Sequence, residues 1–374
     1  MALSTANFNY SCDLQSNETV RCSGQLCSAL LSILMISLII ITVIGNGCVM
    51  YVIYHKSVLH TVTGFMMFNL AVTDFIVGIF NMPFSLAAFV ASQWEFGLAV
   101  CKIVAFIHTQ MSTASVVWLA AISIDRCYAI CRPLKYYSVI TTSKVKIFIA
   151  LGYLISIVVA LPPLFEYKSW GRYRYLGKMA FCWVSDCKAR QYLISLMSFL
   201  LTSFLVIVIC HALIYRSAKS NFRRIPRPTM ADHNDQISNS TTSRTLMPWL
   251  SNFTQVQHNA TVSKRLEIAD KDKINKTTLI IVGTFFICWA PRTIIGILQL
   301  LTTQLDNYGM IELLFLWLSM INSTLNPIIY GFHNKVFRQE FRRAFSYRPH
   351  RIRPIVLPTS NRPSMQSFHR NTSN

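Results

Sequence analysis

Charged side chains interrupt three long apolar runs of this 374-residue chain: Asp74, the neighbours Asp125 and Arg126, and Arg292. An ionisable group in the middle of a bilayer is costly, so each of them is a candidate functional residue. The alternative for Asp74 is a carboxylate satisfied by neighbouring Asn and Ser side chains, as a polar contact between packed helices. A buried arginine needs a carboxylate or phosphate partner, preferably a bidentate one.

The run that ends at Asp125 and Arg126 begins at Cys101 and carries little other charge. As a helix at about 1.5 Å per residue, Cys101 to Arg126 is about 37 Å long, more than the roughly 30 Å hydrocarbon core of a bilayer. The cysteine then lies at one membrane surface and the acid–base pair at the other. We expect this helix to connect the two sides of a membrane.

Seven apolar segments are long enough to cross a bilayer as helices. The composition agrees, because 53% of the residues are hydrophobic and 13% are charged, against about 25% charged residues in a typical soluble domain. A membrane β-barrel would instead show segments of about ten residues with alternating polarity. The sequence predicts an all-α membrane protein, a seven-transmembrane helix bundle, with spans near 29–53, 64–90, 103–125, 145–165, 191–215, 277–301 and 311–330.

Lys and Arg gather in the connections after the first, third and fifth spans and in the tail after Gly331, which indicates that these segments are cytoplasmic. The N-terminus is then extracellular and offers N-glycosylation sequons at Asn9 and Asn17. Residues 1–27 are polar, so we expect no cleavable signal peptide. The net charge of +20 is then mostly a topology signal with attraction to anionic membrane lipids, and we expect no nucleic-acid partner.

Six of the eleven cysteines lie on the predicted outer side, and an even number in an oxidising compartment allows up to three disulfides. The outer cysteines are Cys12, Cys22, Cys27, Cys101, Cys182 and Cys187. The five others, in spans or on the reducing side, are expected to be free thiols.

Sequence landmarks occur in order in all seven spans or their flanks, and together they resemble the rhodopsin-like (class A) G-protein-coupled receptors. Each motif is weak alone, but their joint spacing across about 300 residues is specific. The landmarks are Asn46, Asp74, Cys101, Asp125-Arg126, Pro163, Phe204 with Tyr215, Phe285-x-x-Cys288-Trp289-x-Pro291, and Asn326-Pro327-x-x-Tyr330.

The resemblance implies a multi-pass receptor of the cell membrane, not an enzyme, that binds an extracellular ligand and activates heterotrimeric G proteins through outward movement of the sixth helix. Arrestin and receptor kinases are further expected partners. A transporter or channel, or a non-signalling seven-helix scaffold, are the alternatives. A transporter should show inverted repeats with interrupted helices, which the sequence lacks, and a scaffold would not need Asp74, Arg126 and Tyr330 together.

Two local assignments also follow from the resemblance. Cys101 matches the cysteine that bonds the second outer loop, so Cys182 is its expected partner, with Cys187 the other candidate. No cofactor is implied apart from an allosteric sodium ion, a hard cation that prefers oxygen ligands. The positions that match its site are Asp74, Ser115, Asn322, Ser323 and Asn326.

The resemblance further implies that Asp125 neutralises Arg126 at rest and that Arg126 is freed to meet the G protein. Family members often add an acid at the start of span 6, where this chain has Lys271 between Asp270 and Asp272. We therefore predict readily measurable basal signalling. The other residues matching the activation machinery are Tyr215, Phe285, Trp289, Pro291, Asn326, Pro327 and Tyr330.

Three positions depart from the family pattern. Cys127 follows the acid–base pair where a tyrosine is usual, and Tyr153 stands where span 4 usually has tryptophan. Ile207 replaces the usual span-5 proline, which puts the span-5 bulge and the local pocket geometry in question.

The ligand prediction rests on His108, which stands where amine receptors have an aspartate, and argues against a monoamine. Met320 stands where opsins carry their retinal-bearing lysine, which excludes a retinal-linked photoreceptor. Arg292 suggests an acidic ligand, and the basic second outer loop would attract one. The alternatives for Arg292 are an internal pair with Glu312 or snorkelling to the surface. The predicted ligand-binding residues are His108, Ser112, Trp289, Arg292, Thr293 and Glu312.

The chain divides into an extracellular segment 1–28, a receptor domain 29–331, an amphipathic helix 332–346 and a cytoplasmic tail 347–374. Within the receptor domain, 217–272 is predicted to be a disordered third intracellular loop because it is rich in Ser, Thr, Asn and Pro. Phe337, Phe341 and Phe345 form the apolar face of the amphipathic helix, which we expect on the inner leaflet. The subfamily stays open, with local similarity to melatonin receptors around Cys127–Cys131.

Overall fold

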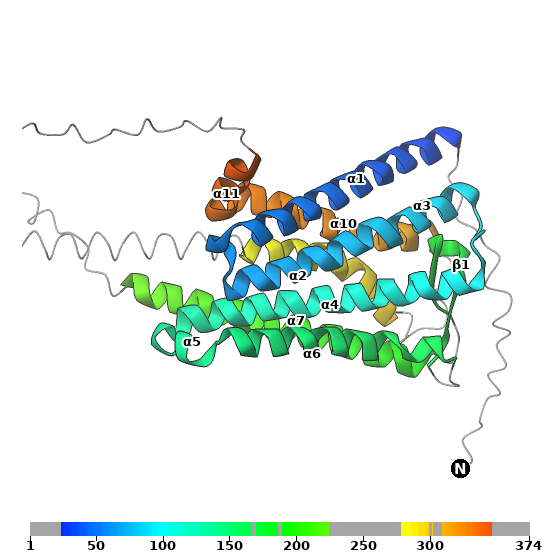
Figure 1. Ribbon diagram of the computed structural model, residues 1–374. Coiled ribbons are helices and arrows are strands. Elements are labelled where there is room, and N and C mark those ends of the chain that lie inside the picture. The colour runs from blue at the N-terminus through cyan, green and yellow to red at the C-terminus, as the bar shows by residue number, and fades with distance from the viewer. Residues whose placement is uncertain are drawn as a thin grey trace, which may run out of the picture.

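A computed structural model of the chain describes residues 24–166, 170–185, 189–223, 278–298, 301 and 309–345. Among these residues, seven helices are long and apolar enough to cross a membrane. They form one bundle of side-by-side helices (Figure 1). The predicted all-α, seven-helix fold is confirmed.

The first three spans are α1 (Gln25–His55), a composite helix 62–91, and α4 (Gly97–Cys131). The composite helix consists of α2 (Val62–Ile76), a π-helical turn η3 (Val77–Asn81) and α3 (Met82–Ala91). The sequence predicts a kink at Pro83, because proline lacks an N–H and clashes with the preceding turn. The structure places the wide π turn immediately before it, and the Asn81 side chain there donates to the Val104 carbonyl at 3.0 Å.

The remaining spans are α6 (Thr142–Ala160), α7 (Arg190–Arg223), the helix Thr278–Leu298 and α10 (Gly309–His333). The short helix α5 (Pro133–Val139) connects α4 to α6. Many α1 side chains are exposed, such as Leu26 and Ile33, as expected for a helix whose outer face meets lipid. The helix α4 crosses the whole bundle and buries residues along its length, from Cys101 to Asp125.

Three helix boundaries differ by a few residues from the predicted segment boundaries. The helix α1 already begins at Gln25, inside the predicted N-terminal segment 1–28. The helix α7 continues to Arg223, so 217–223 of the predicted disordered loop is helical, because Ala, Lys and Arg favour extension of a helix. The rest of that loop lies outside the described residues. The amphipathic helix α11 spans Lys335–Phe345 rather than 332–346, because α10 continues to His333.

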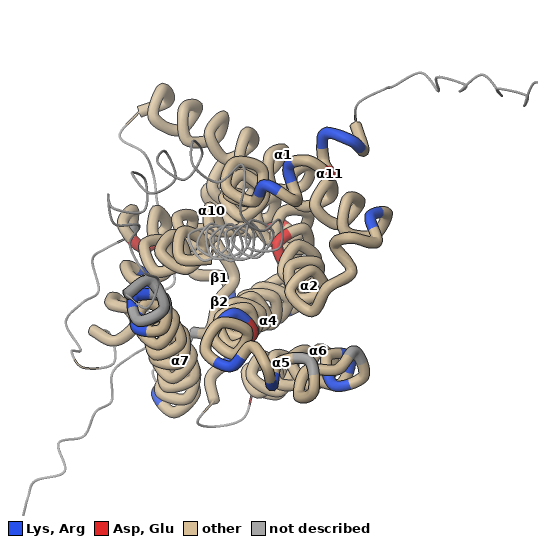
Figure 2. Tube along the Cα trace, turned by 90° about the vertical axis from the view of Figure 1, so that its left-hand side faces the viewer, with Lys and Arg blue, Asp and Glu red and all other residues tan. Residues whose placement is uncertain are grey.

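The start of α11 is capped by the Asn334 side chain, whose oxygen accepts the Phe337 N–H at 3.0 Å. Phe337 is buried, and its ring contacts Phe341, which in turn contacts Phe345. The predicted amphipathic eighth helix is therefore present. In Figure 2, which looks onto the end of the bundle where α5 and α11 lie, Lys and Arg stand around that end of the helices.

A β-hairpin that the sequence did not suggest closes the opposite end of the bundle. Its strands β1 (Arg172–Leu176) and β2 (Phe181–Ser185) are antiparallel, with Tyr173 opposite Val184. At its tip, η5 (Gly177–Met179) is followed by Ala180 in the left-handed region (φ 45°). Met179 and Phe181 are 1% and 0% exposed, so the tip is packed among the helices rather than lying on the surface.

Candidate signalling network and ligand pocket

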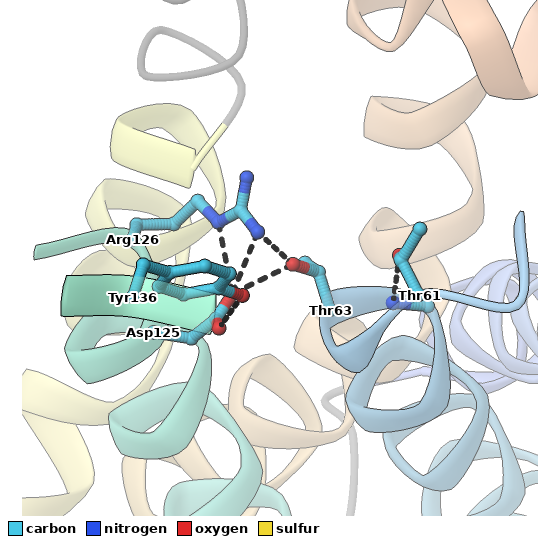
Figure 3. A network of polar contacts seen from close by, with 6 residues as sticks. Thr61, Thr63, Asp125, Arg126 and Tyr136 are labelled. Atoms are coloured by element: carbon cyan, nitrogen blue, oxygen red, sulfur yellow. Dashed lines mark hydrogen bonds and ion pairs between the residues drawn. The ribbon is translucent and has the colours of Figure 1, made fainter. Parts of the chain in front are cut away.

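Four side chains at the α5 end of the bundle form one polar network around Asp125 (Figure 3). The Asp125 carboxylate accepts hydrogen bonds from Arg126 Nη2 at 2.6 Å and from Arg126 Nε at 3.1 Å. It also accepts from the Thr63 hydroxyl at 2.7 Å and from the Tyr136 hydroxyl at 2.6 Å. Arg126 donates to Thr63 Oγ1 as well. The predicted partners Asp125 and Arg126 thus contact each other, and two further residues join them.

Local structure positions both residues that sequence reasoning missed. Thr63 lies in the first turn of α2, where the Thr61 side chain caps the helix by accepting the Gly64 N–H at 3.1 Å. Tyr136 lies on α5, which begins at Pro133, a residue suited to the first turn of a helix. Thr63 is 62 positions from Asp125 in the sequence, and no local sequence pattern predicts such a contact. Asp270, Lys271 and Asp272 lie outside the described residues.

The residues of the predicted sodium site come together in the middle of the bundle. Asp74 is fully buried, and the Asn326 amide donates to its Oδ2 at 2.7 Å. The Ser115 hydroxyl contacts that of Thr73 at 2.9 Å. Asp74 Oδ1 and Asn322 Oδ1 are buried without a hydrogen-bond partner in the described part of the chain. Ser115, Asn322, Ser323 and Asn326 are all buried with Asp74.

This arrangement suits a hard monovalent cation. It offers a carboxylate, hydroxyls and amide oxygens, the ligands that such cations prefer. Among the described residues, no cluster of three His, Cys, Asp or Glu side chains could hold a metal ion. The donor set therefore agrees with the oxygen ligands that the sequence predicts for an allosteric sodium ion.

A small cavity of about 10 Å³, room for the centre of about one water molecule, joins this region to the predicted ligand pocket. His108, Ser112 and Trp289 line its outer part, and the sodium-site positions Ser115 and Asn322 line it as well. Three predicted ligand residues and three predicted sodium residues, Ser323 being the third, therefore border a common space. The other lining residues are Val77, Ser319 and Met320, whereas Arg292, Thr293, Glu312, Asp74 and Asn326 do not line it.

Above this cavity the hairpin covers His108 and Arg292. The His108 ring lies edge-on to Phe181 at 5.0 Å and to Trp183 at 5.5 Å between centroids. The Arg292 guanidinium lies 5.4 Å from the Trp183 ring, and its Nη2 is 4.0 Å from the Met179 sulfur. Glu312 is 6% exposed and attracts Arg292 electrostatically. By contrast, the Thr293 hydroxyl donates to the Trp289 carbonyl of its own helix at 2.9 Å.

The hairpin is held by a disulfide and by buried hydrogen bonds. Cys101 and Cys182 form a disulfide with a Cα–Cα distance of 5.4 Å, so this predicted pairing is confirmed. The Tyr173 hydroxyl donates to the Ala160 carbonyl at 2.7 Å, and its oxygen lies 3.3 Å from Thr109 Oγ1. Burial raises the pKa of Tyr173 to about 12, so its hydroxyl stays protonated and remains a donor. The glycosylation sequons at Asn9 and Asn17, and Cys187, lie outside the described residues.

Aromatic contacts link the pocket to the lower half of the bundle. Phe285 is fully buried, with its ring centroid 5.8 Å from Trp289 and 5.4 Å from Phe204. Tyr330 is 1% exposed, whereas Tyr215 is 67% exposed, so the structure does not bring these two predicted activation residues to one buried site. The landmark prolines Pro291 and Pro327 lie within the helix Thr278–Leu298 and within α10.

Two departures from the expected pattern have local explanations. The Tyr153 ring packs edge-on to Trp118 at 5.1 Å, and Trp118 is fully buried on α4. An indole is thus present between these helices, but α4 supplies it rather than the fourth span. Ile207 is fully buried, so an apolar side chain occupies the place of the usual proline.

Comparison with known proteins places the chain among seven-helix receptors. Residues 45–330 match the sequence profile "7 transmembrane receptor (rhodopsin family)". Trace amine-associated receptor 4 of Rattus norvegicus is 31% identical over 323 residues, which cover 83% of this chain and 83% of that protein. The 5-hydroxytryptamine receptor 1D of Homo sapiens is 27% identical over 338 residues, covering 85% and 89%. The crystal structure of squid rhodopsin has a TM-score of 0.68 at 22% sequence identity, covering 88% of this chain and 87% of that one.

Proposed function

Because the chain belongs to the rhodopsin family of seven-transmembrane receptors, we propose that it binds an extracellular ligand and activates heterotrimeric G proteins without catalysing a reaction. The observation that carries this proposal is the network in which Asp125 and Thr63 accept hydrogen bonds from Arg126, while Thr63 and Tyr136 donate to Asp125. In this state the guanidinium is engaged by its own bundle. Outward movement of the helix Thr278–Leu298 would open that end and let Arg126 turn towards the G protein.

Signal transfer would run from the pocket through Trp289 and Phe285 to the cytoplasmic end. The two rings are in contact, so displacement of Trp289 by a ligand would press on Phe285, which Phe204 supports from α7. Pro291 and Pro327 each remove a backbone hydrogen bond from their helix, which would allow the two helices to bend. Tyr330, Tyr215 and Asn326 would then rearrange to hold the open state.

The ligand class follows from His108 and Arg292. The relatives include receptors named for trace amines and 5-hydroxytryptamine, whereas His108 occupies the position of the aspartate found in amine receptors. Its ring lies edge-on to Phe181 and Trp183, and the positive charge of Arg292 acts on it, so His108 cannot replace the aspartate as the partner of an ammonium group. The ligand is therefore not a simple monoamine and carries an acidic group for Arg292.

Sodium would bind at Asp74 in the resting state, with Ser115, Asn322, Ser323 and Asn326 as further ligands. The unpartnered oxygens of Asp74 and Asn322 support this assignment. The orientation has the N-terminus outside, because Lys and Arg gather around the α5 and α11 end (Figure 2). Arrestin and receptor kinases would act on the Ser and Thr residues of the tail 347–374.

A subtype-resolved G-protein activation assay in cells expressing the full chain tests the function. The receptor should raise the activity of at least one G-protein class, and Arg126→Ala should remove that rise at equal surface expression. Lys335→Ala, an exposed cation at the same end of the bundle, is the matched control and should keep the activity. A substrate flux, or a chain silent in every G-protein class with and without ligand, would favour the transporter or scaffold alternatives.

A further inference from the structure

Near the hairpin tip, among the described residues, Arg292 and Glu312 bring opposite charges from two different helices. Arg292 lies on the helix Thr278–Leu298 and is partly buried, whereas Glu312 lies on α10 and is 6% exposed. The two attract each other. A ligand with a net negative charge would gain from Arg292 and lose to Glu312, since like charges repel strongly where water is excluded. A ligand with one charge of each sign meets both residues favourably.

Among the described residues, the groups that contact the guanidinium leave most of its hydrogen-bonding capacity unused. Its Nη2 meets the Met179 thioether sulfur at 4.0 Å, and a thioether is a weak acceptor. The Trp183 ring lies beside it at 5.4 Å. Arginine carries five donors in a planar fork that matches a carboxylate bidentately. The Met179 sulfur therefore stands where a ligand carboxylate would make a stronger contact.

Aromatic rings surround this charged pair. The His108 ring lies edge-on to both the Phe181 and the Trp183 ring, and Trp289 lines the cavity below. His108 Nδ1 is buried without a hydrogen-bond partner in the described part of the chain. Aromatic rings prefer offset or edge-to-face neighbours, so the ring of a ligand would gain from contact with this cluster. A polar atom on that ring would satisfy His108.

We propose that the ligand is a zwitterionic aromatic amino acid, with its carboxylate on Arg292, its ammonium on Glu312 and its ring against Trp183, Phe181 and His108. This assignment rests on the proposed receptor function with an acid-binding Arg292. Binding exchanges the internal attraction between Arg292 and Glu312 for two ion pairs with the ligand, so the pocket stays electrically balanced. The unbranched Met179 side chain moves aside easily, because methionine adapts to irregular space.

Matched probes separate the two charges of the ligand. L-tryptophan, tryptamine and indole-3-propionic acid share one ring system and differ in which charged groups they carry. L-tyrosine, tyramine and 3-(4-hydroxyphenyl)propionic acid form a second set. Each amino acid should activate G protein in cells, whereas the amine and the acid should be at least about tenfold less potent, the equivalent of about 1.4 kcal/mol for one lost ion pair.

Two variants assign the charges to residues. Glu312→Gln should bring the potencies of L-tryptophan and indole-3-propionic acid together, because the ammonium loses its partner. Arg292→Gln should abolish the responses to both. Glu95→Gln and Arg190→Gln remove exposed charges on the same side of the bundle and should change neither response. Surface expression of every variant is measured in parallel.

Thermal unfolding of the purified receptor is a second readout, and it does not depend on G-protein coupling. Ligand that binds only the folded receptor raises its thermal unfolding temperature, so L-tryptophan or L-tyrosine should stabilise purified full-length receptor more than the matching acid or amine does. Equal effects of acid and amino acid in the wild type, unchanged in Glu312→Gln, would overturn the zwitterion assignment and leave an acidic ligand standing. Selective action of the amines would overturn the acid-binding role of Arg292 itself. No signal and no stabilisation by any of the six probes would also refute the amino-acid class.

Discussion

The polar network around Asp125 and the polar groups in the middle and upper part of the bundle differ in how completely they are satisfied. At the cytoplasmic end, the Asp125 carboxylate accepts four hydrogen bonds from three side chains. In the pocket and the middle of the bundle, His108 Nδ1, Trp289 Nε1, Asn322 Oδ1 and Asp74 Oδ1 have no partner among the described residues. Buried polar atoms without partners are costly. The Asp125 network is therefore closed by the chain's own contacts, whereas these four atoms keep free hydrogen-bonding capacity.

Asp125→Asn should give the largest effect, because it removes the charge that holds Arg126 while keeping the size of the side chain. Basal G-protein activation, measured without ligand and normalised to surface expression, should rise about tenfold or more, since hydrogen bonds to charged groups are worth about 1.5–3 kcal/mol. Unchanged basal activity would show that the network does not restrain the receptor.

Asp74→Asn tests whether the Asp74 carboxylate in the middle of the bundle binds a sodium ion. The wild-type unfolding temperature should be higher in sodium chloride than in choline chloride. At ten times the dissociation constant, a bound ion adds about 1.4 kcal/mol of stability. The variant should lose this sodium dependence. Ser37→Ala, whose hydroxyl bonds only the Ile33 carbonyl of its own helix, should retain it. If the unfolding temperature of Asp74→Asn still depends on sodium, the ion binds at another site.

Thr63→Val and Tyr136→Phe each remove one donor from Asp125 without changing the charge. Each should raise basal activation by a few fold, about 1 kcal/mol for a single hydrogen bond. Ser138→Ala on the same helix α5 is the control, because its hydroxyl donates only to the Lys135 carbonyl. If both variants behave like this control, Asp125 and Arg126 form the restraint alone.

Tyr173→Phe removes the donor that ties the hairpin to Ala160 and Thr109. The purified receptor should lose about 1 kcal/mol of stability against unfolding, with basal signalling unchanged, because the cytoplasmic network is untouched. A rise in basal signalling in this variant would show instead that the hairpin restrains the receptor.

The ion pair between Lys102 and Glu166, at 2.5 Å, should give the smallest effect because both side chains are partly exposed to solvent. Its hydrogen bond and the charges of Lys102, Arg172 and Arg174 lower the pKa of Glu166. A lowered carboxyl pKa contributes stability above the ordinary glutamate value near 4.3, and that stability is lost as the pH falls through the lowered pKa. Glu166→Gln should therefore unfold at a slightly lower temperature at pH 7 and match the wild type in strongly acidic buffer.

The sequence predicts the membrane helices well, because a long apolar segment can be recognised from consecutive residues alone. It also places Asp125 beside Arg126, since they are neighbours in the chain. The contacts of Thr63 and Tyr136, the π turn before Pro83 and the inserted hairpin tip at Met179 and Phe181 were not predicted. Each depends on segments that meet only in the folded bundle, and no periodic pattern marks them. The cysteine pair Cys101–Cys182 is the exception, found through resemblance rather than through physics.

The direct test of the central claim is nucleotide exchange on purified G protein by three receptors: wild type, Asp125→Asn, and Asp125→Asn combined with Arg126→Ala. If the network restrains the receptor through Arg126, the first substitution raises exchange and the second removes that gain at equal receptor amount and unfolding temperature. A double variant that keeps the full gain would contradict the account, because activation would then not depend on the arginine that the network holds.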